Sequence, residues 1–149
     1  MGEGDFAVVP SSLIDEENAY IFLPSCSVCA SSHKLSVHPL SDTLTLVADA
    51  SKWDEKCSCH ELEPMLVECL KTDEDSIHAL RSDNRLYVCV LKENALVFVN
   101  RFTVNCDEDI LYHILAAYKA TDLDRMHTPL LVRGELDKVF LKKYIARCE

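Results

Sequence analysis

Hydrophobic residues alternate most regularly in the C-terminal half of the chain. In residues 86–91 an apolar side chain at every second position marks one face, which predicts a β-strand. Residues 92–94 predict a tight turn, because Asn94 tolerates the left-handed backbone of such turns, and residues 95–100 are then expected to return antiparallel. Residues 101–104 are expected to form the next strand. The pattern therefore predicts three consecutive strands.

Helical spacing follows these strands. Asn105 is expected to cap a helix, with Glu108 completing a capping box, and the apolar positions after it recur at helical intervals. Residues 129–132 are fully apolar, which is typical of a central parallel strand, and Gly134 ends them. A last helix is expected from Glu135. The order hairpin, third strand, helix, parallel strand, helix is that of ribonuclease H-like units, and actin-like ATPases contain two such units facing across a nucleotide cleft.

The N-terminal half is less regular. Residues 11–17 resemble a capped helix start, and residues 35–48 alternate as a strand does, most clearly at 43–47. A short helix is expected at 50–56, and a longer one at 61–71, where apolar residues share one face. We therefore divide the chain into residues 1–83 and 84–149, the second being the βββαβα unit.

Composition narrows the classes of partner. The 149 residues carry a formal charge of −10, from 15 basic and 25 acidic side chains. Such a surface repels phosphate backbones and anionic lipids, which disfavours nucleic acid and membranes as partners. No apolar run is long enough to span a membrane, and the first residues lack the pattern of a signal peptide. The eight cysteines are scattered through strand and helix patterns, which favours free thiols in a reducing cytoplasm.

Three segments, 85–102, 107–115 and 129–135, resemble an uncharacterised family from Bacteroidetes whose members are assigned an actin-like ATPase fold. Residues 6–18, and Cys59-His60 before Pro64, resemble it as well. The resemblance implies an α/β protein in which a ribonuclease H-like βββαβα C-terminal lobe packs with a truncated α/β N-terminal lobe. The N-terminal lobe is expected to be truncated because family members have a further N-terminal portion. The family supplies a fold and no reaction.

The chemistry of an actin-like ATPase needs an Asp and a glycine-rich turn at the first hairpin, where backbone N–H groups wrap the phosphates and carboxylates hold Mg²⁺. The hairpin at 87–94 has no glycine and no Asp. The adenosine-side glycine pair is expected near 132–135, where Gly134 stands alone as a degenerate cofactor-binding position. ATP and Mg²⁺ are therefore not expected, and no catalytic residue is assigned. A two-metal nuclease is also disfavoured, because residues 86–91 carry no carboxylate.

Zinc is a sharper alternative. Cys26, Cys29, Cys57 and Cys59 could supply four soft ligands to a tetrahedral site, although Cys-x-Cys is tighter than the usual knuckle. The competing interpretation is that this chain uses cysteine as a small apolar residue. Cys26 and Cys29 could also be a redox pair, which requires an exposed cysteine at a helix N-terminus after a strand. They follow a helical pattern instead, so the redox pair is disfavoured.

The leading hypothesis is a non-enzymatic cytoplasmic scaffold that acts through protein–protein contact. A lobe without its first strands is expected to expose a sheet edge that a protein partner or a second copy covers. The first alternative is a nucleotide-binding actin-like ATPase whose missing half is supplied elsewhere. The second alternative is a zinc-binding module.

Overall fold

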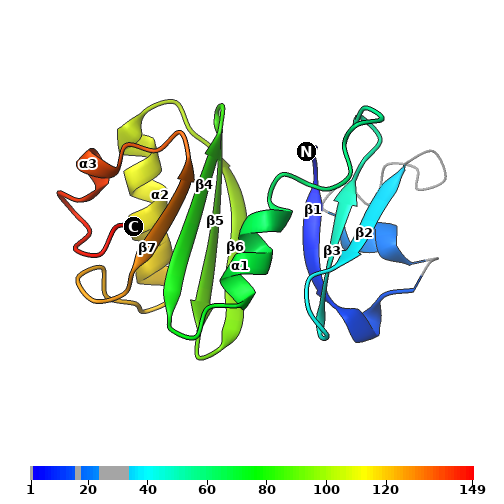
Figure 1. Cartoon of the computed structure of the whole chain (residues 1–149), viewed down its shortest axis with the longest axis horizontal. Coiled ribbons are helices and arrows are strands. Elements are labelled where there is room, and N and C mark those ends of the chain that lie inside the picture. The colour runs from blue at the N-terminus through cyan, green and yellow to red at the C-terminus, as the bar shows by residue number, and fades with distance from the viewer. Residues whose placement is uncertain (1, 16–17, 24–33) are drawn as a thin grey trace. The chain divides into compact units, whose positions relative to one another are not determined.

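The chain forms two compact units, Met1–Val67 and Glu68–Glu149, each with its own sheet (Figure 1). The computed structural model describes residues 2–15, 18–23 and 34–149. The units divide at 67/68, whereas the sequence pattern placed the division at 83/84. The difference arises because residues 76–82 form a strand that pairs with the next one in the second sheet.

The first unit contains a three-stranded antiparallel sheet of order β1-β3-β2. Its strands are β1 (Phe6–Pro10), β2 (Leu35–Pro39) and β3 (Leu44–Asp49). The single stretch expected at 35–48 is therefore a hairpin of two strands. Val9, Ala19, Leu23 and Val47 form a small buried core on this sheet.

Two helices expected in the first unit are absent from its described residues. The segment from residue 11 forms two 3₁₀ turns, η1 (Ser11–Leu13) and η2 (Ala19–Phe22), and residues 50–56 form turns. In those turns the Asp54 side chain accepts backbone N–H bonds from Lys56 and Cys57. Such local side-chain bonds favour turns over helix. The helix expected at 61–71 is present as α1 (Glu63–Leu70), with Pro64 in its first turn, where proline is tolerated.

The second unit contains a four-stranded sheet of order β6-β5-β4-β7, in which β7 runs parallel to β4. Its elements are, in chain order, β4 (Ser76–Ser82), β5 (Arg85–Lys92), β6 (Ala95–Thr103), α2 (Asp107–Ala120), β7 (Leu130–Gly134) and α3 (Lys138–Leu141). The βββαβα order is confirmed, but its three strands are formed by other residues than predicted. The first strand is β4, and the two strands expected over 95–104 are the single strand β6.

Turns and caps explain the remaining differences. The β5–β6 turn is confirmed, with Glu93 and Asn94 at φ 53° and 62°. The N-cap of α2 is Cys106 rather than Asn105, whose backbone N–H donates to the Asp109 carboxylate at 2.9 Å. The strand β7 lies at one end of the sheet order rather than in its centre, and α3 begins after Asp137, whose side chain accepts from the Phe140 N–H.

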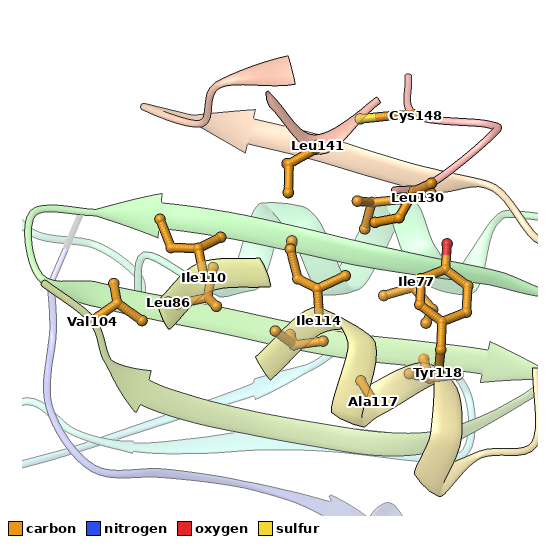
Figure 2. Close-up of a cluster of buried hydrophobic side chains, with 14 residues drawn as sticks. Ile77, Leu86, Val104, Ile110, Ile114, Ala117, Tyr118, Leu130, Leu141 and Cys148 are labelled. Carbon is orange, nitrogen blue, oxygen red and sulfur yellow. The ribbon is translucent and has the colours of Figure 1, made fainter. Parts of the chain in front are cut away.

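An apolar core fills the space between α2 and one face of the second sheet (Figure 2). Alternate residues of β4 and β5 point into it, and the apolar stripe of α2 meets them. Its most buried members include Ile77, Leu86, Val88, Val90, Ile110, Ile114 and Leu130. The intervening strand residues, Ser76, His78 and Cys89, point to the opposite face and are also fully buried.

Candidate functional site

The carboxyl ends of β4 and β7 are where an open α/β sheet normally binds its ligand. At this end Arg81 pairs with Gly134 in the parallel register. Gly134 has φ 75°, and a Cβ on it would lie 2.2 Å from the Arg81 carbonyl oxygen. The two backbones therefore approach so closely that only glycine fits. Close strand packing accounts for this glycine without a cofactor, and its role in binding adenosine stays a prediction.

The side chain of Arg81 links three chain segments at this end. Its Nε donates to the carbonyl oxygen of Asp83 at 3.0 Å, and its Nη1 donates to that of Glu135 at 3.5 Å. Nη1 also lies 4.0 Å from the carboxylate of Asp107, at the start of α2. A phosphate site presents backbone N–H groups. Here two N–H groups of the guanidinium are already bonded to backbone carbonyl oxygens.

The β4–β5 turn is the true first hairpin of this unit. Asp83 and Asn84 form it, and Asp83 adopts φ 52°. The turn has an Asp but no glycine, and β4 itself carries no carboxylate. The sequence argument examined the β5–β6 turn, whereas the first hairpin of the unit is the β4–β5 turn, which differs in carrying an Asp.

The opposite end of the same sheet carries an open groove of about 530 Å³. Its lining comes from the second half of α2, the loop before β7 and the segment after α3: Leu115, Tyr118, Lys119, Leu123, Asp124, Arg125 and Tyr144. Arg125 Nη1 donates to the Tyr144 carbonyl at 2.7 Å, and the Tyr118 hydroxyl donates to the Thr128 carbonyl at 2.9 Å. These bonds hold the groove walls together.

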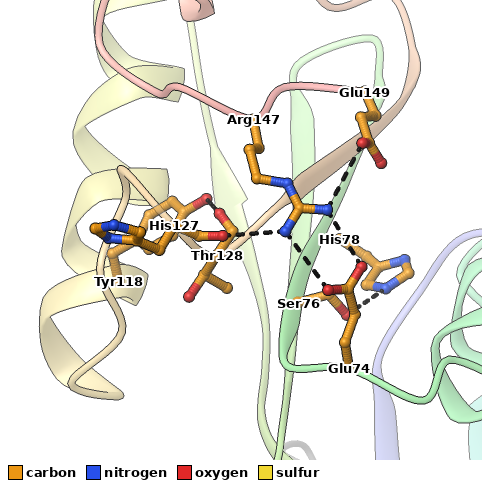
Figure 3. Close-up of polar contacts among 8 residues, drawn as sticks. All are labelled: Glu74, Ser76, His78, Tyr118, His127, Thr128, Arg147 and Glu149. Atoms are coloured by element: carbon orange, nitrogen blue, oxygen red, sulfur yellow. Dashed lines mark hydrogen bonds and ion pairs between the residues drawn. The ribbon is translucent and has the colours of Figure 1, made fainter.

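Arg147 fixes the segment behind this groove (Figure 3). Its guanidinium donates to the His127 carbonyl at 3.2 Å and pairs with Glu74 at 3.4 Å. The backbone on either side of Cys148 adds to β7 through Leu130, whose N–H donates to Arg147 O at 2.7 Å. These bonds join the C-terminal segment to β7 and to the loop before it.

The segments that contribute Arg125 and Tyr144 to the groove carry further exposed apolar residues and basic ones. Val139 is 74% exposed, Met126 55% and Tyr144 40%. Residues 138–147 contain four basic side chains, Lys138, Lys142, Lys143 and Arg147, and no acidic one. This segment is therefore positively charged, although the whole chain has a net charge of −10. Apolar patches with such a rim are typical of interaction surfaces.

Sequence reasoning missed a buried polar cluster on the second sheet. Ser76 Oγ and His78 Nε2 are 3.0 Å apart, and among the described residues His78 Nδ1 has no hydrogen-bond partner (Figure 3). Cys89 is the cross-strand neighbour of His78, and Cys69 of α1 is also fully buried. The available signal was a histidine between Ile77 and Ala79, and it was lost because β4 was not recognised.

The pKa values of the two buried thiols, Cys69 and Cys89, are shifted in opposite directions. A hydrogen bond from the Cys89 thiol, supported by His78, lowers the pKa of Cys69 to about 6. The pKa of Cys89 is raised by the same hydrogen bond and by burial. A thiolate is the reactive form of cysteine, so Cys69 is the more nucleophilic of the pair at neutral pH.

Of the four cysteines predicted to bind zinc, two lie among the residues that the structure describes. Cys26 and Cys29 lie outside the described residues, and Cys57 and Cys59 are half-buried free thiols. Burial and the nearby Glu63 carboxylate raise the pKa of Cys59. In residues 2–15, 18–23 and 34–149 no group of three or more potential ligands is placed to hold a metal. The zinc site stays a prediction, which elemental analysis of the purified chain tests.

Comparisons with known proteins give a fold and a family. A Bacteroides thetaiotaomicron crystal structure described as a protein with actin-like ATPase fold and unknown function is similar, with a TM-score of 0.73 and 15% identity. The match covers 96% of this chain and 63% of that one, so the chain spans less than two thirds of its length. The likeness confirms the mixed α/β, actin-like and ribonuclease H-like fold. No curated protein matches.

No described helix is long and apolar enough to cross a membrane. A family model described as "Protein of unknown function (DUF3822)" matches residues 53–146, which is more than half of the chain. The resemblance to an uncharacterised family of actin-like fold, inferred from the sequence, is thereby confirmed. The chain belongs to the DUF3822 family of proteins of unknown function.

Proposed function

We propose that this chain is a non-enzymatic interaction scaffold, which binds an acidic segment of a partner protein in the groove beside the C-terminal half of α2. The observation that supports the proposal is the combination of an apolar groove with basic side chains, in a chain whose net charge is −10. Charge complementarity selects an acidic partner, and apolar contacts supply most of the affinity.

The groove is suited to a short peptide anchor. Leu115, Leu123 and the Tyr144 ring offer apolar surface, while Lys119 and Arg125 stand beside them as cations. An apolar side chain of the partner would fill the groove, and flanking carboxylates would pair with the cations. The expected ligand is therefore an acidic segment with one or two large apolar residues.

The other end of the sheet supports the same interpretation. An ATPase lobe needs N–H donors and glycine where this chain places the Arg81 guanidinium and two carbonyl oxygens. The actin-like fold of the solved neighbour favours nucleotide binding as the second candidate. Fold alone is weak support for a reaction, because unrelated functions share folds.

Peptide selection tests the scaffold directly. The purified chain is immobilised, and random peptides are selected against it and then measured by fluorescence polarisation. We expect enriched peptides to combine Asp or Glu with Leu, Phe or Trp, and to bind more weakly at high salt because ion pairs are screened. A lack of enrichment, or peptides without acidic residues, contradicts the proposal.

Two charge reversals locate the binding surface. Lys119→Glu changes an exposed residue of the groove, and Lys71→Glu changes an exposed lysine that does not line it. Lys119→Glu is expected to weaken peptide binding about tenfold, and Lys71→Glu to leave it nearly unchanged. Equal losses in both variants contradict the groove. A thermal shift with Mg·ATP addresses the second candidate, and a clear stabilisation by nucleotide would replace the scaffold with it.

A further inference from the structure

The strand β2 forms one edge of the sheet of the first unit (Figure 1). It pairs with β3 on one side, in an antiparallel register. Just before the strand, the N–H of Ala50 donates to the Lys34 carbonyl at 2.8 Å, so Lys34 belongs to a hydrogen-bonded pair. Such pairs alternate along an antiparallel ladder. Ser36 and His38 are therefore the strand residues whose backbone groups bond to β3.

The residues between them direct their backbone groups away from β3. These are Leu35, Val37 and Pro39, and their outward side is the open edge of the sheet. The N–H groups of Leu35 and Val37 have no hydrogen-bond partner among the residues that the structure describes. Pro39 has no N–H group, and proline is tolerated in a strand where this side faces no neighbour. The edge therefore offers backbone donors and acceptors to an added strand.

Both edges of the second sheet are at least partly covered by the chain itself. Beside β7, the N–H of Leu130 donates to the Arg147 carbonyl at 2.7 Å. In β6, the N–H of Arg101 donates to the Asn100 side chain at 2.8 Å. Proteins protect exposed edges in such ways, because an unprotected edge pairs with other chains. The outward N–H groups of β2 are not protected in this way within the described ranges.

A groove of about 430 Å³ runs along the edge of β2. Residues 34–38 line it, together with Ala50, Trp53, Cys57 and Ser58 from the loop after β3. Successive residues of a strand point to opposite faces of the sheet. Since residues of both faces line the groove, it follows the edge of the strand and not one face. The groove therefore lies where an added strand would pair.

Charge selects the kind of partner. Residues 1–67 contain 11 acidic and three basic side chains, so the first unit has a net charge of −8. Such a unit attracts a basic segment and repels a second copy of itself. In the groove, the Trp53 indole is held by its N–H, which donates to the Glu3 carbonyl at 2.7 Å. The face of a tryptophan ring is a favourable contact for Lys or Arg.

We propose that the edge of β2 binds an extended basic segment of a partner protein, which adds to the first sheet as a further strand. Backbone bonds to Leu35 and Val37 supply affinity, and alternate basic side chains of the segment select for the acidic unit. This surface is independent of the groove beside α2, which belongs to the other unit and is proposed to take an acidic segment.

Amide hydrogen exchange of the full chain, followed by NMR, tests the edge directly. The probe is a synthetic peptide about as long as β2, in which lysine and valine alternate. We expect the Leu35 and Val37 amides to exchange rapidly in the free chain, and about tenfold more slowly at saturating peptide. Ser36 and His38 should change little, because their N–H groups already bond to β3.

A matched pair of variants separates backbone pairing from charge attraction. Val37→Pro removes the outward N–H and keeps the bonds to β3, whereas Val37→Thr keeps the N–H. By fluorescence polarisation, Val37→Pro is expected to weaken peptide binding about tenfold, and Val37→Thr by less than about twofold. Equal affinities of the two variants contradict strand addition.

Modified peptides test the same bonds without changing the chain, which matters if Val37→Pro is misfolded by circular dichroism. One peptide is N-methylated at its valines and the other at its lysines. Only alternate residues of an added strand face β2, so one of the two is expected to lose about tenfold in affinity and the other much less. Equal losses contradict the proposal.

Three further results overturn the proposal. Leu35 and Val37 amides that are already protected in the free chain at every concentration would show that another part of the chain covers the edge. Protection that grows with chain concentration would show that a second copy does. Protection by the acidic peptides selected for the groove beside α2, and not by the basic probe, would reverse the assigned charge of the partner and leave the proposed function standing.

Discussion

The two faces of the second sheet are built from the same strands and differ in chemistry. Val88 and Val90 of β5 point to α2 and join a wholly apolar core, whereas Cys89 between them points to the other face beside His78. On β4 and β5, both faces carry fully buried side chains. The apolar face gains free energy from burial alone, while the polar face must satisfy each buried group with a partner. One face therefore stabilises the fold, and the other carries reactive groups.

The largest expected effect is on the apolar face. Ile114→Ala removes a fully buried side chain of α2 from the core. We expect a loss of about 3 kcal/mol in the free energy of unfolding of the second unit, from lost burial and the cavity left behind. Urea unfolding followed by far-UV circular dichroism measures it. A loss below about 1 kcal/mol would mean that this face does not dominate stability.

Stability should also depend on the hydrogen bond between Ser76 and His78 on the polar face. Ser76→Ala removes the hydroxyl that lies 3.0 Å from His78 Nε2 and leaves a buried imidazole with neither nitrogen bonded. The expected loss is about 2 kcal/mol. Combining Ser76→Ala with His78→Phe should cost less than the sum of the single changes, since an apolar ring needs no partner. Additive losses in this cycle contradict a coupled pair.

The thiols of the polar face should make stability depend on pH. The pKa of Cys69 is about 6 in the folded chain, below that of an unfolded cysteine, so the folded state binds fewer protons between these values. Stability should therefore rise with pH from about 6 to 8.5, by at most about 1.4 kcal/mol per unit, and be lost as pH falls through that range. Urea unfolding at several pH values measures the slope, and Cys69→Ser should flatten it. The same slope in Cys69→Ser would assign it to other groups.

The smallest effect should come from the one hydroxyl at the edge of the apolar core. The Tyr118 hydroxyl donates to the Thr128 carbonyl at 2.9 Å, and burial raises its pKa. Tyr118→Phe is expected to cost about 1 kcal/mol by urea unfolding, because one hydrogen bond is lost and the ring still packs. Tyr112→Phe, on an exposed side chain of the same helix, is the control and should change stability by less than about 0.5 kcal/mol.

Sequence patterns predicted the apolar face well and the polar face poorly. The alternation in β5 and the helical spacing in α2 follow directly from burial on one side, so both elements were found. The strand β4 was missed because polar residues, Ser76 and His78, occupy its second buried face. Burial on both faces removes the alternation of apolar and polar residues that marks a strand in a sequence. Propensity also led to Asn105 as the cap of α2, whereas the observed cap is Cys106.

The candidate sites depend on contacts that only the tertiary structure creates. His78 and Cys89 meet because β4 pairs with β5, and the groove joins residues from 115 to 144. The spacing of cysteines drew attention to Cys57 and Cys59 instead, because short spacings are visible in a sequence and distant pairs are not. The search for a phosphate-binding hairpin examined the wrong turn, because β4 was not recognised as a strand.

Arg81 has a consequence for how the second unit responds to its surroundings. A ligand bound at the ends of β4 and β7 would stabilise the unit in proportion to the logarithm of its free concentration. The guanidinium that joins Asp83 and Glu135 is covalently part of the chain, so its local concentration never changes. The loops at this end are thus held together from the moment the unit folds. The link between these loops is therefore built into the fold itself.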